Sequence, residues 1–355
     1  GSTWLSPLSN TRTDRYGGSL ENRMRFGLET AQRVRKVIPK ETPLLVRISV
    51  TDYGNGGWDV PQSVEFAKRL KAIGVDVVDC SSGGVVGNVD YGSFNSPEVQ
   101  HKAAATIQRE AGIPTAAVGK IVHPFQAEKL LQDNSATLIL IGRALLNNPH
   151  WAYGAADVLA NSETFKYPDP YNWCIGATKA SKLFSPVKLG GLTLKNRIGV
   201  SPMVTWVSED GYVNDFQLAH YGSFAIGGVG LIVVEATAVE ARGRITPADL
   251  GIWKDDHVEG LKRLATLIKS QGAVPAIQLA HAGRKGSTPV IGKGVRGETL
   301  TAKNGGWDIV APSAIAYDDD KSQVPKEATL EDIEVLQKAF ETAAIRAVKA
   351  GFEGA

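Results

Sequence analysis

The fold of this chain is decided by the stretch Ala136-Thr-Leu-Ile-Leu-Ile-Gly-Arg-Ala-Leu-Leu-Asn-Asn-Pro149. Its apolar run ends at Gly142 and is typical of a strand that is buried on both faces of a parallel sheet. The residues after Gly142 predict a helical turn. Its first backbone N–H groups and the guanidinium of Arg143 would suit an anion, so we expect a phosphate group there.

A second short strand, expected at residues 115–119, ends in the same way at Gly119. Two neighbouring strand ends of this kind are typical of the phosphate site that the last two strands of a (β/α)8 barrel form. We therefore expect strands from the end of a barrel to lie in the first half of this chain.

The composition allows one large core and disfavours several kinds of partner. The 355 residues are 43% apolar and 21% charged, and single barrels of this length are common. The net charge of +2 and the lack of a basic block argue against nucleic acid, and no apolar run is long enough to cross a membrane. Cys80 and Cys174 have no spacing typical of a disulfide framework or a metal site. We expect a small-molecule partner, no metal and a cytoplasmic location.

A unit of helix, glycine and short apolar strand recurs along the chain. Ser19 and Thr329 are expected to cap helices that run to about Ile38 and to Ala350, and Gly74 to end the helix over residues 61–73. Residues 282–326 are expected to form an irregular rim. Strands are expected at 44–50, 75–80, 115–119, the run ending at Gly142, 198–203, 230–236 and 274–281, with a stub at 352–355.

Seven strands and a stub, alternating with helices, predict parallel pairing and an α/β fold of the TIM (β/α)8 barrel type. A doubly wound open sheet is the alternative. Residues 175–182 are small and polar and predict a linker. We expect residues 1–355 to form a single domain.

Several motifs resemble the Old Yellow Enzyme family of FMN-dependent ene-reductases, and its thermophilic-like branch in particular. The resemblance covers nearly the whole chain, and its most specific motif is residues 5–23. The other motifs are Val46-Arg47, Ile141-Gly-Arg143, Ser201-Pro-Met203, 230–236 and 278–284. Their order is rotated relative to the family. The resemblance therefore implies an engineered circular permutant, in which 1–174 is the family's C-terminal half, 175–182 joins the old termini and 183–355 is the N-terminal half.

The resemblance also implies FMN at the C-terminal face of the barrel, NADPH or NADH as the reductant and an activated alkene as the substrate. An arginine beside the flavin N1 would stabilise negative charge, and an amide can pair with the flavin's carbonyl and N–H edge. The implied cofactor residues are Pro202, Met203 and Val204 against the ring system, Ala236 and Gln278 at its pyrimidine side, Arg47 at N1 and O2, and Gly119, Gly142 and Arg143 at the phosphate.

One departure from the family concerns catalysis. The family's His-x-x-His-x-Tyr segment, which anchors the substrate carbonyl and supplies a proton, occurs nowhere in this sequence. The weak catalytic candidates are Trp206, which replaces a usual tyrosine, and His281, which a packed rim histidine would explain as well. Tyr53 and Tyr317 are further substitutes for the missing groups.

Three functions stay open from the sequence. The first is an NAD(P)H-dependent ene-reductase, and the second is a flavin-binding scaffold with impaired alkene reduction. The third, a non-flavin phosphosugar barrel, is disfavoured by Pro202, Gln278 and Arg47. A homodimer is possible, although the stretch at residues 171–174 lacks the arginine that the family's branch uses between subunits. Unpaired strand edges predict that residues 3–10 and 352–355 are mobile or exchanged with a neighbour.

Overall fold

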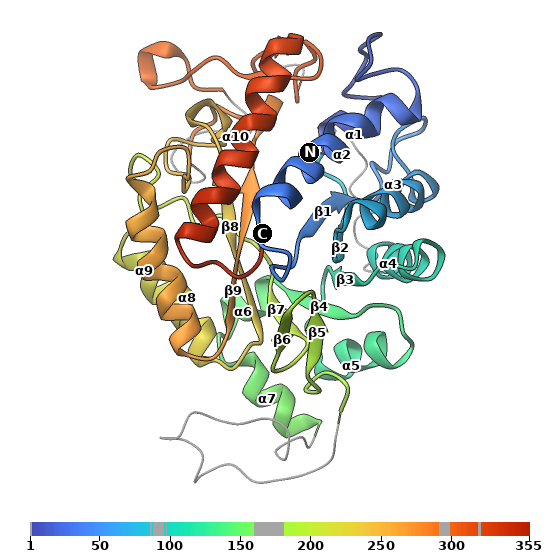
Figure 1. The fold of residues 1–355 in the computed structure, drawn as a ribbon, viewed down its shortest axis with the longest axis vertical. Coiled ribbons are helices and arrows are strands. Elements are labelled where there is room, and N and C mark those ends of the chain that lie inside the picture. Colours follow the sequence, from blue (N-terminus) through green and yellow to red (C-terminus); the bar gives the residue numbers. More distant parts are fainter. Residues whose placement is uncertain are drawn as a thin grey trace.

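The computed structural model describes residues 2–85, 87, 96, 98–159, 181–290, 299–318 and 321–355, and Figure 1 shows their arrangement. Most of the predicted linker, residues 175–180, lies outside the described residues, as do Cys174 and the stretch at 171–174. Among the described residues, no helix is long and apolar enough to cross a membrane, and no three acidic, histidine or cysteine side chains are grouped to hold a metal.

The centre of the molecule is one parallel sheet, whose strand order β1-β2-β3-β4-β7-β8-β9 follows the chain. All seven strands were predicted from the sequence. Their order has no reversal of the kind that defines a doubly wound sheet, so that alternative is wrong. The strands are β1 Leu45–Ser49, β2 Val77–Ser81, β3 Thr115–Val118, β4 Leu138–Ile141, β7 Ile198–Val200, β8 Leu231–Ala238 and β9 Val274–Ala280.

The sheet closes on itself at its base through the stub at residues 353–355. On one side the Leu45 N–H donates to the Ala355 carbonyl at 2.8 Å, and on the other the Ile277 N–H donates to the Gly354 carbonyl at 3.1 Å. The stub thus occupies an eighth position between β9 and β1, near the C-terminal label of Figure 1. The fold is an α/β barrel.

Helices cover the outside of the barrel, and local sequence signals determine where several of them begin and end. Ser19 accepts a hydrogen bond from the Asn22 N–H at the start of α2, and Thr329 forms a capping box with Asp332 at the start of α10. Helix α3 ends at Gly74, which adopts φ 96°. The helices are α1 Ser2–Leu5, α2 Leu20–Val37, α3 Val60–Ile73, α4 Glu98–Ala111, α5 Pro124–Gln132, α6 Arg143–Asn147, α7 Trp151–Val158, α8 Asp215–Ile226, α9 His257–Ser270 and α10 Leu330–Lys349.

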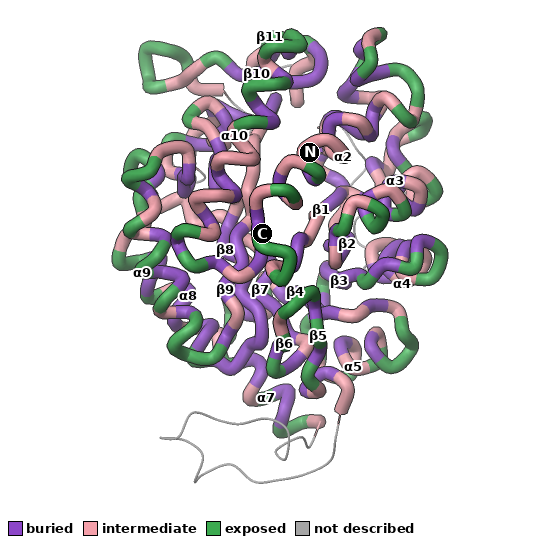
Figure 2. The backbone as a smooth tube through the Cα atoms, in the orientation of Figure 1, coloured by how far each residue is buried: buried purple, intermediate pink, exposed green. Residues whose placement is uncertain are grey.

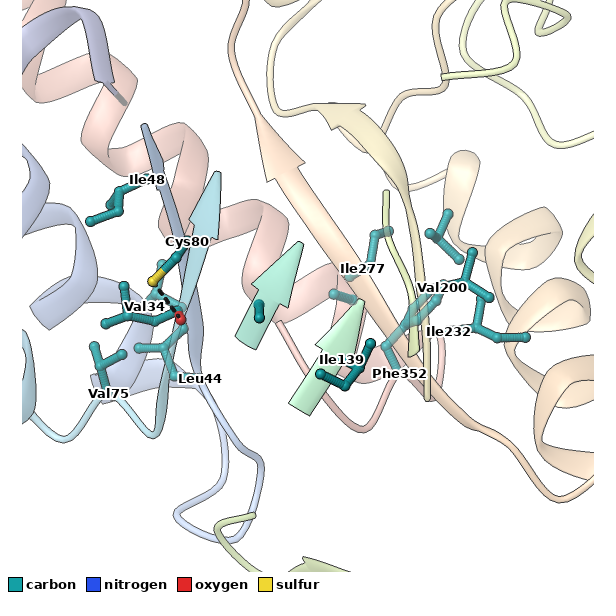
Figure 3. Close-up of a cluster of buried hydrophobic side chains, with 14 of the residues drawn as sticks. Val34, Leu44, Ile48, Val75, Cys80, Ile139, Val200, Ile232, Ile277 and Phe352 are labelled. Atoms are coloured by element: carbon teal, nitrogen blue, oxygen red, sulfur yellow. Dashed lines mark hydrogen bonds between the residues drawn. The ribbon is translucent and has the colours of Figure 1, made fainter. Parts of the chain in front are cut away.

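Buried apolar side chains form two clusters, one on each face of the barrel wall. Because side chains alternate along a strand, every second residue points outward to the helices, and Figure 3 shows this layer with Ile48, Cys80 and Ile277 among its members. Figure 2 shows the burial of the strands, which is complete in β3, β4 and β7, whereas most of β1 is intermediate. The inner cluster is completed by Leu189 and Leu194 of a hairpin, β5 Val187–Leu189 and β6 Leu192–Leu194, so this hairpin plugs the barrel.

The remaining described elements lie in or near the predicted irregular rim. They are the strands β10 Val310–Ala311 and β11 Lys326–Glu327 and the short 3-10 turns Ala241–Gly243, Gly283–Lys285 and Ala302–Asn304. Residues 3–10 and 352–355, whose mobility or exchange with a neighbour stays a prediction, make contacts within the chain. Trp4 stacks on Phe26 with ring centroids 4.3 Å apart, and the Asn10 side chain donates to the Trp4 carbonyl at 2.7 Å. Both ends find partners on neighbouring elements, which the sequence pattern did not reveal.

Candidate functional site

Arg47 of β1 points into the barrel and reaches across it. Its Nη1 donates to Asp79 Oδ2 at 2.5 Å and to Ser201 Oγ at 3.2 Å. Ser201 directly precedes Pro202 and Met203, so the guanidinium lies beside the segment that was predicted to contact a flavin ring. Burial raises the pKa of the Asp79 carboxyl, and the neighbouring Arg47 charge opposes that rise.

Gln278 and Ala236 face each other across neighbouring strands. They are partners in the register of β8 and β9, next to an irregularity at Val234 and Ala236. The Gln278 side chain has no hydrogen-bond partner among the described residues. Arg47, Pro202 and Gln278 line the same cavity. The volume of this cavity is about 260 Å³. An unpaired amide and a guanidinium in one cavity provide the donors and acceptors that a polar ring edge requires.

The two predicted phosphate strands end side by side, as β3 and β4. A Cβ atom on Gly142 would lie 3.2 Å from Met203 Sδ, which places this strand end against the segment after β7. Gly142 is the N-cap of α6, and the exposed Arg143 that follows has no partner among the described residues. Gly119 adopts φ 114°, and its carbonyl accepts from His101 Nε2 at 3.0 Å.

Replacing Gly119 by alanine is expected to lower the free energy of unfolding by about 1–3 kcal/mol. The φ of 114° is strained for any L side chain, and the new Cβ would lie 1.8 Å from Gln100 Oε1. Urea unfolding measures the loss. Adding Gln100→Ala removes the clash but not the backbone strain, so we expect the double variant to recover only part of it. Full recovery would contradict this account.

Glu235 of β8 fixes the segment after β7, and the sequence analysis missed it. Its carboxylate accepts from the Thr205 N–H and the Thr205 hydroxyl, each at 2.8 Å, and from the Tyr221 hydroxyl at 3.2 Å. Burial raises the pKa of this carboxyl, and these donors oppose the rise. Trp206, which follows Thr205, adopts φ 52°, and its indole nitrogen is buried with no partner among the described residues. The signal for Glu235 was a charged residue inside an apolar strand, which also marked Arg47.

The weak catalytic candidates do not converge on the Arg47 cavity. Of His281, Tyr53, Tyr317 and Trp206, the cavity lining includes His281 alone. His281 Nε2 lies 2.8 Å from Glu240 Oε1, and its Nδ1 accepts from the Gly283 N–H at 3.0 Å, so both ring nitrogens are engaged. This favours the packed rim histidine over a catalytic one.

Beside these candidates, Lys285 places its ammonium 4.9 Å from the centre of the Tyr317 ring. Burial lowers the pKa of Lys285 to about 8. The Tyr53 hydroxyl pairs with Ser82 Oγ at 2.8 Å. These two tyrosines therefore lie along the rim of the barrel rather than at the guanidinium of Arg47.

Comparison with known families decides what this arrangement is. The model of the NADH:flavin oxidoreductase / NADH oxidase family matches residues 2–161 and 182–355. The chain belongs to this family. The family predicted from the sequence is thus confirmed, and its description is consistent with the predicted FMN cofactor.

Individual members of the NADH:flavin oxidoreductase family match in part. An NADPH dehydrogenase of Geobacillus sp. (strain WCH70) is 49% identical over 173 residues, 48% of this chain and 46% of that protein. Its counterpart in Bacillus subtilis (strain 168) is 47% identical over 176 residues, 49% and 47% of the two chains. The chain spans about half the length of the curated relatives it matches. The Old Yellow Enzyme of Pichia sp. AKU4542 superposes with 27% identity and a TM-score of 0.42, over 48% of this chain and 44% of that one.

The residues present fit FMN. Within the part of the chain that the structure describes, only Nη1 of Arg47 is engaged, which leaves its other N–H groups for an acceptor, and the Gln278 amide has no partner. Both groups line one cavity, and together they offer the donors and acceptor that a flavin's polar ring edge requires. The glycine ends of β3 and β4, with the exposed Arg143, leave room and charge for a phosphate. Val204 and Trp206 are half-buried in the segment that begins at Pro202.

Proposed function

We propose that this chain is an FMN-dependent NAD(P)H oxidoreductase that reduces the activated C=C bonds of enones and enals. The observation that supports this most is the cavity that Arg47, Gln278 and Pro202 line together, with unpaired polar groups on the first two. The pairing of Arg47 with Asp79 uses only Nη1, and the Gln278 amide has no partner among the described residues, so both side chains present polar groups to the cavity that a ligand could satisfy.

The residues have separate tasks in this proposal. When bound, FMN supplies two-electron transfer between the nicotinamide and the alkene. The free N–H groups of Arg47 would hold the negative charge that develops at the edge of the ring, and Gln278 would fix the orientation of the ring through its amide. Arg143 would hold the phosphate, with Gly119 and Gly142 allowing the backbone to approach it.

A second candidate is a flavin-binding scaffold with impaired alkene reduction. One observation favours it: both ring nitrogens of His281 are engaged, and the other candidates lie outside the cavity lining, so none of the four candidates offers a free donor there. The absence of a positioned proton donor would slow alkene reduction about 10²- to 10⁴-fold. Reduction of the flavin itself would be less affected, because it needs only contact with the nicotinamide.

We also infer that the chain is an engineered circular permutant. The family model matches in two blocks on either side of residues 162–181, and the relatives match over about half of the chain at a time. Both findings support an order of segments that differs from that of the relatives.

We further propose a small-molecule alkene as the substrate, no nucleic-acid or membrane partner, a cytoplasmic location and a homodimer. Light scattering tests the homodimer.

The proposal is tested by titrating FMN and then following electrons. Saturation with FMN at about 100 times its dissociation constant should raise the free energy of unfolding by about 2.7 kcal/mol. Anaerobic stopped-flow then follows bleaching by NADPH and reoxidation by 2-cyclohexenone. Fast reoxidation supports the ene-reductase, and slow reoxidation by the enone with fast reoxidation by a quinone supports the scaffold. A protein that binds no FMN would overturn both.

A further inference from the structure

Glu235 is the extra residue of a bulge in β8. The register with β9 passes from Val234 directly to Ala236 and leaves Glu235 without a strand partner. Its backbone N–H donates instead to the Tyr221 hydroxyl of α8 at 2.9 Å. A bulge redirects the side chains of its strand, and bulges are common beside active sites.

The bulge changes which residues of β8 face the interior of the barrel. Val233 lines the cavity, and Val234 belongs to the outer apolar layer. Strict alternation along the strand would turn residue 235 inward. With the extra residue, the Glu235 carboxyl turns towards α8, and Ala236 becomes the partner of Gln278, which lines the cavity. The bulge thus keeps a carboxyl out of the interior and aims it at the helix layer.

The segment after β7 has a single backbone anchor between its ends. Residues 202–207 form no helix or strand, and the N–H groups of Ser201 and Ser208 on either side donate to backbone carbonyls. Of the N–H groups at residues 203–207, only that of Thr205 is hydrogen-bonded within the described ranges. Its acceptor is the Glu235 carboxyl, which also accepts from the Thr205 hydroxyl.

Helix α8 holds the Glu235 carboxyl in place. Besides Thr205, the carboxyl accepts from the Tyr221 hydroxyl at 3.2 Å and from Gln217 Nε2 at 3.3 Å. Gln217 also forms the capping box with Asn214 that begins α8. The start of a helix outside the barrel therefore fixes the carboxyl, and the carboxyl fixes Thr205.

We propose that Glu235 is a positioning residue of the flavin site, which acts through Thr205 to hold residues 202–206 in the place where they receive the ring system of FMN. The inference rests on the proposed function, because that function assigns Pro202, Met203 and Val204 to the ring. It adds the origin of their placement, which comes from the bulge in β8 and from α8. A segment that is held beforehand does not have to be ordered when FMN binds, so the affinity is not reduced by that cost.

The test compares FMN binding by the full chain and by Glu235→Ala. Flavin fluorescence measures the affinity, and visible circular dichroism of bound FMN at saturation reports the surroundings of the ring. If the segment without its anchor occupies the binding position about a tenth of the time, the apparent dissociation constant rises about tenfold. The dichroism at saturation should change too, because the side chains around the ring no longer keep one arrangement. A loss of stability alone would not alter the spectrum of the folded, saturated protein.

Asp249 provides a matched control. Its carboxyl is also buried, and it accepts from the N–H and the hydroxyl of a threonine, Thr246, at 3.0 and 2.8 Å. The lining of the Arg47 cavity, as far as the structure describes it, includes neither of these two residues. Asp249→Ala should therefore destabilise the fold and leave the FMN affinity and the dichroism unchanged.

The conservative variant separates positioning from a general effect of substitution. Glu235→Gln keeps an oxygen acceptor for the Thr205 N–H, and its amide can donate to the Thr205 hydroxyl. It should restore most of the affinity and the dichroism of the unmodified chain. A Glu235→Gln protein as impaired as Glu235→Ala would contradict the role of the Thr205 anchor.

The remaining outcomes are distinguishable. Equal affinity and dichroism in Glu235→Ala and the unmodified chain would overturn the inference, as would the same change in Asp249→Ala. If Glu235→Ala does not fold, Tyr221→Phe decides. It removes one donor to the carboxyl and the acceptor of the Glu235 N–H, so a smaller change in the same direction is expected, and no change would overturn the inference. A chain that binds no FMN in any form would overturn the proposed function and this inference with it, whereas FMN binding that is insensitive to these substitutions overturns the inference alone.

Discussion

Arg47→Ala is expected to lower the free energy of unfolding by about 3–5 kcal/mol. The substitution removes the partner of Asp79, which is 4% exposed and accepts from Arg47 at 2.5 Å, and so leaves a carboxylate buried and unpaired. Urea unfolding at pH 7 without FMN measures the loss. FMN affinity should fall as well, because the guanidinium N–H groups that face the cavity disappear with the side chain.

The pH dependence identifies the cause of that loss. Burial already raises the pKa of Asp79, and removing Arg47 raises it further. A group whose pKa is higher in the folded state than in the unfolded state contributes stability that is fully present below the unfolded pKa, about 3.9, and is lost as the pH rises through the folded pKa. The deficit of Arg47→Ala should therefore shrink as the pH falls towards 4. The double variant Arg47→Met/Asp79→Leu should be near the unmodified chain. A deficit that is the same at all pH values would count against this cause.

Glu235→Ala should have the second largest effect. The substitution leaves the Thr205 N–H, the Thr205 hydroxyl and the Tyr221 hydroxyl without their acceptor, and a buried group that loses its partner costs about 1–3 kcal/mol. We expect a loss of roughly 3 kcal/mol or more in the free energy of unfolding. Hydrogen exchange should also rise between Pro202 and Trp206, because the strained φ of Trp206 is no longer held.

Two milder variants serve as controls for this clamp. Thr205→Val removes only the hydroxyl bond and should cost about 1 kcal/mol. Glu235→Gln keeps the size of the side chain and one oxygen acceptor, and it removes a charge that burial disfavours, so its cost should lie below that of the alanine variant. If all three variants unfold at the same urea concentration as the unmodified chain, the segment after β7 is held by other contacts.

Much of the fold was predictable because its determinants are local. The helix caps at Ser19 and Thr329 and the helix end at Gly74 depend on only a few neighbouring residues. Each short apolar run predicts a strand without information from the rest of the chain. The anchoring of the chain ends was not predictable in this way. The hydrogen bonds of Gly354 and Ala355 go to strands that are distant in sequence, and no local pattern carries that information.

The candidate site was predictable where a single residue broke a pattern. Arg47 and Gln278 are polar residues inside apolar strands, and both proved to line one cavity. Glu235 broke the pattern of β8 in the same manner, but its role depends on Thr205 and Tyr221, which come from two other elements. The sequence could mark Glu235 as unusual, whereas only the structure could say which backbone it holds.

The closure of the barrel by the stub also bears on how the chain folds. Strands that neighbour each other in the sheet also neighbour each other along the chain, so most of the wall can assemble from contacts at modest sequence separation. The pairing of Leu45 with Ala355 is the exception among the strands, because it joins segments that are far apart in the sequence and carries a large entropy of loop closure. Closure is therefore expected after the transition state, and its few hydrogen bonds set how long the native barrel persists rather than how fast it forms.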